Sequence, residues 1–261
     1  MELLNIMDIT VNYGKDEKAS VKNFNLTLQP GEIIALVGES GSGKTTVLRS
    51  ILGLLPGKGK VEQGDILFQG TSLLTLEQKQ WKNLRGTEIS MIFQDSGAMI
   101  NPIRTIGDQF VEYIRMHKKV GKKEAWKRGS DMLAKMHLQD AERIMKSYPF
   151  QLSGGMRQRV GIAMAMTFQP KILLADEPTS ALDVAVQRQV VQEMLSLREM
   201  FGTAMLLVTH DIGVASAMAD TMLVLKDGAV MEYGDTRQVL EAPENEYTRK
   251  LLAAVPRLRR I

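Results

Sequence analysis

The chain has 261 residues, 44% hydrophobic and 24% charged, so it is long enough to bury a sizeable core as one large domain or two subdomains. No apolar run approaches the roughly 18 residues that cross a bilayer, and the N-terminal MELLNIMDITVN carries acidic residues where a secretion signal needs basic ones. The absence of cysteine excludes disulfides, thiolate metal sites and cysteine nucleophiles, and suits a reducing cytoplasm. We therefore expect a chain that is neither exported nor membrane-spanning.

The net charge of +3 is unevenly distributed along the chain. Residues 113–150 hold ten Lys and Arg against four Asp and Glu, and residues 247–261 hold five basic and no acidic residues. Such segments could face an anionic membrane leaflet or nucleic acid, although a solvated helix face is the commoner explanation of each alone. We expect no nucleic-acid partner, because aromatic residues are not regularly interleaved with the basic ones.

The first expected elements are antiparallel strands. Three early stretches alternate apolar and polar residues as such strands do: MDITVNYG (7–14), ASVKNFNLTLQ (19–29) and GDILFQG (64–70). Three other runs are short and uniformly apolar, which indicates parallel strands buried on both faces: IIALV (33–37), ILLA (172–175) and AMLLV (204–208). A helix-like stretch follows each of these runs, so the sequence predicts an α/β fold with ligands at the carboxyl ends of the parallel strands.

Between about residues 96 and 169 the strand-like runs disappear and amphipathic segments such as EAWKRGSDMLAKMHL (124–138) dominate. This change indicates a helical subdomain inserted into the α/β core. Residues 222–234 then predict a hairpin around Asp227-Gly228, and a helical tail follows from about residue 235.

The loop GESGSGKT matches the phosphate-loop pattern G-x-x-x-x-G-K-[ST], and it lies between an expected buried strand and an expected helix. Its glycines allow backbone N–H groups to point at phosphate oxygens, and the helix N-terminus adds its dipole. We expect Lys44 to bind the β- and γ-phosphates and the Thr45 hydroxyl to ligate Mg²⁺. The candidate nucleotide-binding residues here are Gly38, Glu39, Ser40, Gly41, Ser42, Gly43, Lys44, Thr45 and Thr46.

The run ILLADE (172–177) supplies acidic groups at the end of another expected strand. Asp176 is a candidate ligand of Mg²⁺ or of its waters, and Glu177 is a candidate base that orients or deprotonates an attacking water. Together with the phosphate loop, this pair favours ATP hydrolysis over simple nucleotide binding. Kinase and GTPase activities are disfavoured, because the sequence has no acceptor-substrate motif and no guanine-binding N-K-x-D.

A second glycine pair lies in LSGGMRQR (152–159), just before a helix-like run. Ser153 is a natural helix N-cap, and its hydroxyl, the backbone N–H groups of Gly154 and Gly155 and the positive helix end could bind phosphate oxygens.

These motifs together resemble the ATP-binding cassette (ABC) family over essentially the whole chain. GESGSGKT resembles the Walker A loop, ILLADE the Walker B strand, and LSGGM the family signature LSGGQ, with Met156 in the last place. The single residues that resemble family positions are Gln94 (the Q-loop glutamine), Asp183 in SALD (the D-loop), His210 (the switch histidine) and Tyr13 (the aromatic that stacks on adenine).

The resemblance implies a P-loop NTPase (RecA-like) core with an N-terminal antiparallel β-subdomain and an inserted α-helical subdomain. The expected boundaries are 1–95 and 170–234 for the ATP-binding core, 96–169 for the helical subdomain with the signature, and 235–261 for the tail. It also implies ATP and Mg²⁺, with Glu177, His210 and Gln94 as catalytic residues and with Thr45, Gln94 and Asp176 around Mg²⁺, partly through water. In such a family two cassettes pair head to tail, so Ser153, Gly154, Gly155 and Asp183 would serve a nucleotide bound to the partner chain.

Three segments resemble the D-type ATPase of dipeptide, oligopeptide or nickel importers: residues 93–110, 146–159 and 242–256. This implies a second ATPase (a paralogue or a second copy), two integral membrane permeases, an extracytoplasmic solute-binding protein, and a peripheral location on the cytoplasmic face of the inner membrane. SGAM (96–99) replaces the usual Pro-Met-Thr-Ser in the groove for the permease's coupling helix, and the cysteine-bearing tail of many peptide ATPases is missing. The short form favours nickel or metal chelates as the solute, and peptides remain the alternative.

A competing hypothesis is a non-transport ATP switch that acts on nucleic acid or a soluble protein, supported only by the two basic segments. A catalytically degenerate cassette is disfavoured, because every expected catalytic residue is present.

Overall fold

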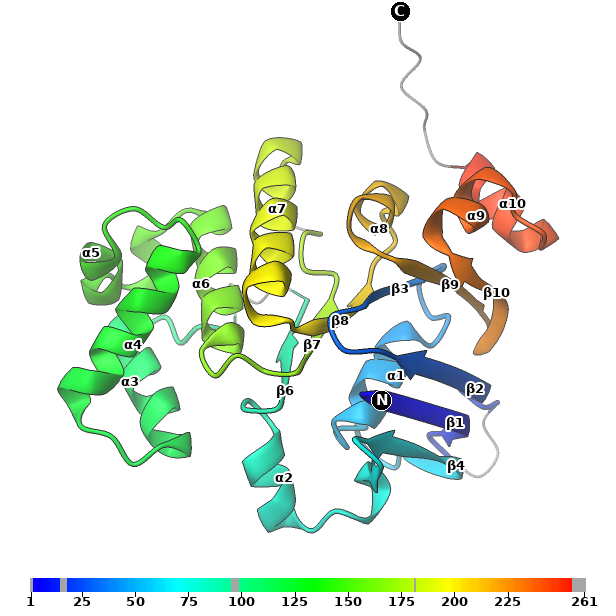
Figure 1. Cartoon of the computed structure of the whole chain (residues 1–261), viewed down its shortest axis with the longest axis horizontal. Coiled ribbons are helices and arrows are strands. Elements are labelled where there is room, and N and C mark those ends of the chain that lie inside the picture. Colours follow the sequence, from blue (N-terminus) through cyan, green and yellow to red (C-terminus); the bar gives the residue numbers. More distant parts are fainter. Residues whose placement is uncertain (1, 15–17, 95–98, 181, 255–261) are drawn as a thin grey trace, which may run out of the picture. The chain divides into compact units, whose positions relative to one another are not determined.

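The computed structural model of this protein describes residues 2–14, 18–94, 99–180 and 182–254, shown in Figure 1. The chain divides into two compact units: residues 1–77 with 204–261 form unit 1, and residues 78–203 form unit 2. Unit 2 joins the residues predicted as a helical subdomain with strands from the predicted core, and the boundaries at 96 and 169 stay a prediction. Among the described residues, no helix has the length and apolar character of a membrane span.

Unit 1 begins with an antiparallel sheet in the order β2-β1-β4-β5. Its strands are β1 (Leu4–Asn12), β2 (Val21–Leu28), β4 (Lys60–Phe68) and β5 (Thr71–Ser72), and a 3₁₀ turn follows at Leu73–Thr75. Leu4 of the central strand β1 lies opposite Leu28 on one side and Phe68 on the other, and all three are buried. This confirms the antiparallel strands expected from the alternating N-terminal pattern.

The second sheet of unit 1 carries its strands in the order β10-β9-β3-β8. These are β3 (Ile33–Val37), β8 (Ala204–Val208), β9 (Thr221–Lys226) and β10 (Ala229–Asp235), with helices α1 (Lys44–Ile51), α8 (Ile212–Met218), α9 (Thr236–Glu241) and α10 (Glu246–Ala253). Strand β3 pairs in parallel with β8 and with β9, and all five residues of β3 and of β8 are buried. A strand buried on both faces needs apolar residues at every position, which explains the unbroken runs IIALV and AMLLV.

Unit 2 combines a parallel strand pair with a set of helices. The strands are β6 (Ile89–Ile92) and β7 (Ile172–Asp176), and the helices are α2 (Gln78–Leu84), α3 (Ile106–His117), α4 (Lys122–Lys135), α5 (Ala141–Lys146), α6 (Gly154–Met166) and α7 (Val184–Phe201), with a 3₁₀ turn at Pro149–Gln151. The described part of residues 96–169 is therefore helical, as predicted. Parallel buried strands and covering helices in the two units confirm the α/β class.

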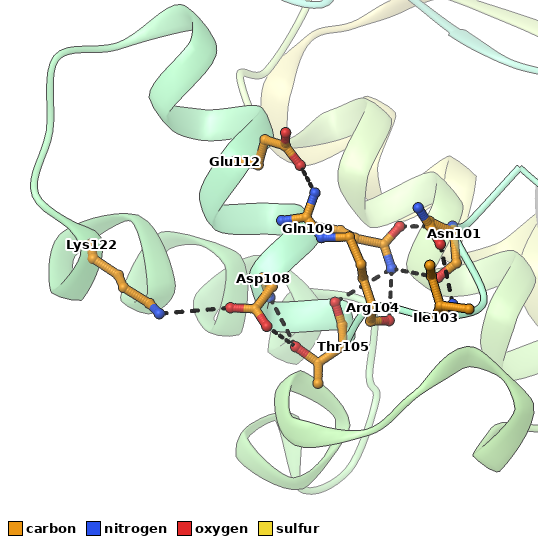
Figure 2. Close-up of polar contacts among 8 residues, drawn as sticks. All are labelled: Asn101, Ile103, Arg104, Thr105, Asp108, Gln109, Glu112 and Lys122. Atoms are coloured by element: carbon orange, nitrogen blue, oxygen red, sulfur yellow. Dashed lines mark hydrogen bonds and ion pairs between the residues drawn. The ribbon is translucent and has the colours of Figure 1, made fainter.

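The start of α3 is held by a compact set of polar contacts, drawn in Figure 2. Thr105 caps the helix by accepting from the backbone N–H of Asp108 at 3.2 Å. The Gln109 side chain accepts from the Asn101 N–H at 2.9 Å and donates to the carbonyls of Asn101, Arg104 and Thr105 at 3.1, 3.1 and 3.3 Å. The exposed loop before α3 is thereby fixed to the helix that follows it.

Candidate functional site

The phosphate loop (residues 38–45) connects the end of β3 to the start of α1 in unit 1. Gly38, Gly41 and Gly43 have φ angles of 151°, 80° and 104°, a region that L side chains rarely adopt. A Cβ atom at Gly38 would lie 2.2 Å from the carbonyl oxygen of Leu225, so only glycine fits there. The loop is thus a backbone cradle, as the motif predicts.

Lys44 closes this cradle with its own side chain. It is only 6% exposed, and its Nζ donates to the carbonyls of Gly38 and Glu39 at 2.8 and 2.7 Å and to the Ser42 Oγ at 3.2 Å. Gly43 precedes α1 without a capping side chain, so the cradle leads directly into a helix N-terminus, whose dipole favours an anion. A buried ammonium and an uncapped helix end on one loop provide a site for phosphate.

Tyr13 lies beside the first turn of α1. Its hydroxyl is 3.3 Å from the Thr46 Oγ1, and its ring packs so closely on Gly59 that a Cβ atom there would be 2.7 Å from the ring's Cε1. Thr45 and Thr46 are half-buried on α1, whereas Ser40 is exposed on the loop. The structure therefore places Tyr13 next to the predicted nucleotide-binding residues.

His210 lies at the same edge of the unit 1 sheet as the phosphate loop. Leu36 of β3 is the register partner of Val208 of β8, and Gly38 and His210 each follow two residues later. His210 is exposed, and Asp211 beside it caps α8. Parallel pairing is the physical reason why residues so far apart in sequence meet at one edge.

In unit 2 the predicted acidic pair and the predicted glutamine share another strand edge. Ile92 of β6 is the register partner of Ala175 of β7. Asp176, 6% exposed, ends β7 and Glu177 follows it, while Gln94 follows β6 and is exposed. The structure thus brings Gln94, Asp176 and Glu177 to one edge. From the sequence, this proximity was implied only by the resemblance to the ABC family.

Glu177 has a backbone conformation that is unusual for a residue with a side chain, with φ at 48°. Its carbonyl accepts from the Ser180 N–H at 3.3 Å and from the Ser180 Oγ at 3.2 Å, which holds the turn. Asp183 then caps α7 by accepting from two backbone N–H groups at 3.1 and 3.0 Å. Ala181, the second residue of SALD, lies outside the described residues.

The second glycine pair begins α6, as predicted. The Ser153 Oγ accepts from the Met156 N–H at 3.2 Å, and both Ser153 and Gly154 are exposed. A Cβ atom at Gly155 would lie 2.5 Å from the Val186 Cγ1 of α7. The cap, the exposed glycine and the close helix contact present the N-terminus of α6 on the surface of unit 2.

Two residues that the sequence did not single out fasten α6 to the acidic turn and to α7. The Gln158 side chain donates to the carbonyl of Pro178, next to Glu177. Arg159 pairs with Glu193 at 3.2 Å, with side chains 14% and 4% exposed. Burial raises the pKa of the Glu193 carboxyl, and the Arg159 charge opposes that rise. Polar residues in the largely apolar run after LSGG are the signal that could have identified them.

The predicted Mg²⁺ ligand Thr45 lies in unit 1 and the predicted ligand Asp176 lies in unit 2, and each has its own chemistry toward the metal. In the part of the chain that the structure describes, no three or more His, Cys, Asp or Glu residues are grouped so that they could hold a metal by themselves. Mg²⁺ in phosphate-binding sites commonly takes one or two protein ligands, phosphate oxygens and waters. The Thr45 hydroxyl and the buried Asp176 carboxylate are oxygen ligands of that kind.

Comparison with known proteins gives one consistent result. A family model described as ABC transporter matches residues 21–180. The chain is 42% identical over 258 residues to the oligopeptide transport ATP-binding protein OppD of Salmonella typhimurium, which covers 98% of this chain and 77% of that protein. It is 39% identical over 259 residues to the dipeptide transport ATP-binding protein DppD of Lactococcus lactis subsp. cremoris, covering 98% and 74%.

Among solved structures, the fold is similar to the ATP-binding cassette MJ0796 in a dimeric post-hydrolysis state bound to ADP and Pi. The TM-score is 0.78 and the sequence identity 30%, covering 90% of this chain and 99% of that one. The similarity confirms the predicted P-loop NTPase fold with its antiparallel β-subdomain and helical insertion.

Proposed function

The chain belongs to the ABC transporter family, and we propose that it couples ATP hydrolysis to the import of peptides through partner permeases. It is an ATP-binding, ATP-hydrolysing ABC importer subunit. The observation that carries the finer proposal is the alignment of 98% of the chain with ATP-binding proteins of peptide transporters. It is supported by a phosphate loop that is complete in sequence and in backbone geometry.

The proposed roles follow the chemistry of each group. Lys44 and the N-terminus of α1 bind the β- and γ-phosphates, and the Thr45 hydroxyl and Asp176 carboxylate hold Mg²⁺, which neutralises phosphate charge when bound. Glu177 orients or deprotonates the attacking water, and His210 and Gln94 help to position it. Lys44 and Thr45 lie in the first turn of α1, directly after the phosphate loop, whereas Asp176, Glu177, His210 and Gln94 lie at the carboxyl end of a strand or in the loop that follows it.

Members of this family act as dimers together with membrane permeases. We propose that Ser153, Gly154, Gly155 and Asp183 contact a nucleotide bound to the partner subunit. The exposure of Ser153, Gly154 and Asp183 in unit 2 supports this role, because a group that serves another chain must be accessible.

The proposed contact with the permease is the loop before α3. Met99 and Ile103 are 64% and 82% exposed, and the Gln109 contacts hold this loop in one shape (Figure 2). A fixed apolar surface suits a short helix from a membrane subunit. Residues 96–98 of the SGAM departure lie outside the described residues. On this proposal the chain is peripheral at the cytoplasmic face of the inner membrane.

The relatives named above act on oligopeptides and dipeptides, which favours peptides as the solute over nickel or metal chelates. The expected result is that the chain co-purifies from its own cells with two integral membrane proteins, and that deletion of its gene abolishes peptide uptake but not nickel uptake. If deletion abolished nickel uptake alone, the solute would be nickel rather than peptides. A stable complex with nucleic acid or a soluble protein, without permeases, would instead favour the switch hypothesis.

Replacing Tyr13 with Ala is expected to raise the KM for ATP about fivefold or more, because base–aromatic stacking contributes about 1–3 kcal/mol. The value of kcat at saturating ATP should change little. Tyr13→Phe keeps the ring and removes only the hydroxyl beside the Thr46 Oγ1, so its KM should stay near that of the wild type. Equal KM values for the Ala and Phe variants would contradict adenine stacking by Tyr13.

A further inference from the structure

Helix α10 is anchored to the edge of unit 1 by several polar contacts. The Asn245 side chain caps it by accepting from the Tyr247 N–H at 2.8 Å. Glu232 of β10 accepts from the backbone N–H groups of Glu244 and Asn245 at 2.8 and 3.2 Å. Figure 1 shows α10 with α9 at the β10 side of unit 1. The first turn of this helix, and hence Tyr247, has a fixed position on the sheet.

Tyr247 packs from this helix onto the core of unit 1 and against the Lys226 side chain. Its ring packs against the buried cluster that contains Ala35 and Val37 of β3, the strand that leads into the loop. The Lys226 Nζ lies 4.7 Å from the ring centroid. Burial raises the pKa of the Tyr247 phenol, and the charges of Glu39 and Asp227 raise it further.

Lys226 lies in the backbone segment of residues 225–228, which packs against the phosphate loop and forms its outer wall. The Gly228 N–H donates to the Ser42 carbonyl at 3.1 Å. The Leu225 carbonyl meets the loop at Gly38, where a Cβ atom would be 2.2 Å away. Residues 225–228 therefore touch the cradle at Gly38 and at Ser42, and Tyr247 contacts the Lys226 side chain within that segment.

We propose that Tyr247 is a positioning residue for the phosphate loop: its ring holds Lys226 and the loop's outer wall, so that ATP affinity depends on the docking of α10. The inference rests on the proposed nucleotide-binding role of Lys44 and its loop. It goes beyond that role because no part of α10 belongs to the phosphate-loop, acidic or signature motifs.

Thermodynamic linkage gives this proposal two measurable consequences. If docked α10 favours the loop shape that binds phosphate, then nucleotide binding must favour docking of α10 by the same factor. A purely structural role for Tyr247 would change protein stability without this coupling. The two effects can therefore be separated in one set of variants.

The first test compares Tyr247→Leu with Tyr247→Phe in the full chain. Leu keeps apolar packing but removes the ring from Lys226, and a half-exposed cation–π contact of about 0.5–1 kcal/mol corresponds to about two- to fivefold in affinity. We expect the KM and the Kd for MgATP to rise at least twofold in Tyr247→Leu, with kcat nearly unchanged, and to stay near wild type in Tyr247→Phe. Lys250→Ala, on an exposed position of the same helix, is the matched control and should not change either constant.

The second test measures hydrogen exchange of α10 with and without MgADP. Nucleotide should slow exchange of the α10 amides in the wild type, and this protection should shrink in Tyr247→Leu. The proposal is overturned if Tyr247→Leu matches Lys250→Ala within twofold in both constants, if Tyr247→Phe loses as much affinity as Tyr247→Leu, or if MgADP leaves α10 exchange unchanged. A wild-type chain that does not bind ATP would overturn the proposed function as well, whereas normal wild-type binding with these outcomes overturns only the role of Tyr247.

Discussion

Replacing Glu177 with Gln is expected to reduce steady-state ATP hydrolysis about 100-fold or more while ATP still binds. The amide has nearly the same shape as the carboxylate but cannot accept a proton from water, and general-base catalysis contributes about 10²–10⁴ in rate. The phosphate-loop residues that bind ATP are unchanged, so the protein should accumulate as an ATP-bound dimer. Phosphate release at saturating MgATP and size-exclusion chromatography measure the two effects.

The same substitution at Glu199, an exposed residue of α7, provides the matched control and should leave hydrolysis at the wild-type rate. The local fold should tolerate Glu177→Gln, because the substitution keeps the backbone carbonyl to which the Ser180 N–H and Oγ donate and which holds the turn. Hydrolysis within a fewfold of the wild type would show that Glu177 is not the base.

Replacing Ser153 with Arg is expected to lower hydrolysis at least about tenfold, because lost donors to a developing phosphate charge typically cost that much or more. Ser153 is exposed at the start of α6 and accepts only a local backbone bond from Met156 among the contacts described above. The substitution leaves the phosphate loop of its own chain intact, so the Kd for MgATP of the isolated chain should change less than twofold. Phosphate release and equilibrium nucleotide binding separate these effects.

Ser153→Thr keeps a hydroxyl and a helix cap, so it controls for the cost of about 1 kcal/mol that loss of the cap brings to α6. If the chain pairs with itself, mixing the Ser153→Arg variant with a Lys44→Ala variant should restore part of the activity. One of the two sites in the mixed dimer then combines an intact phosphate loop with an intact Ser153. Equal losses of binding and hydrolysis in Ser153→Arg alone would contradict a role on the partner's nucleotide.

The sequence predicted strands better than it predicted contacts. The runs 33–37, 172–175 and 204–208 match β3, β7 and β8 to within one residue, because a strand buried on both faces requires an unbroken apolar run. The contacts of Gln158 with Pro178 and of Arg159 with Glu193 were not predicted. A polar residue on a helix has no periodic signal that tells which distant backbone atom or acid will meet it.

What the sequence determined by itself was local chemistry: a glycine loop with Lys44, a strand that ends in Asp176 and Glu177, and a capped helix that begins at Ser153. These motifs are short, and their spacing along the chain is enough to identify them and the family. The tertiary structure decided which residues share an edge, as Gly38 with His210 and Gln94 with Asp176 do through strand register. It also placed Tyr247 against the wall of the phosphate loop, more than 200 residues away in sequence from Gly38. Side-chain packing between residues so far apart in sequence depends on the whole fold, so a local sequence pattern does not predict it.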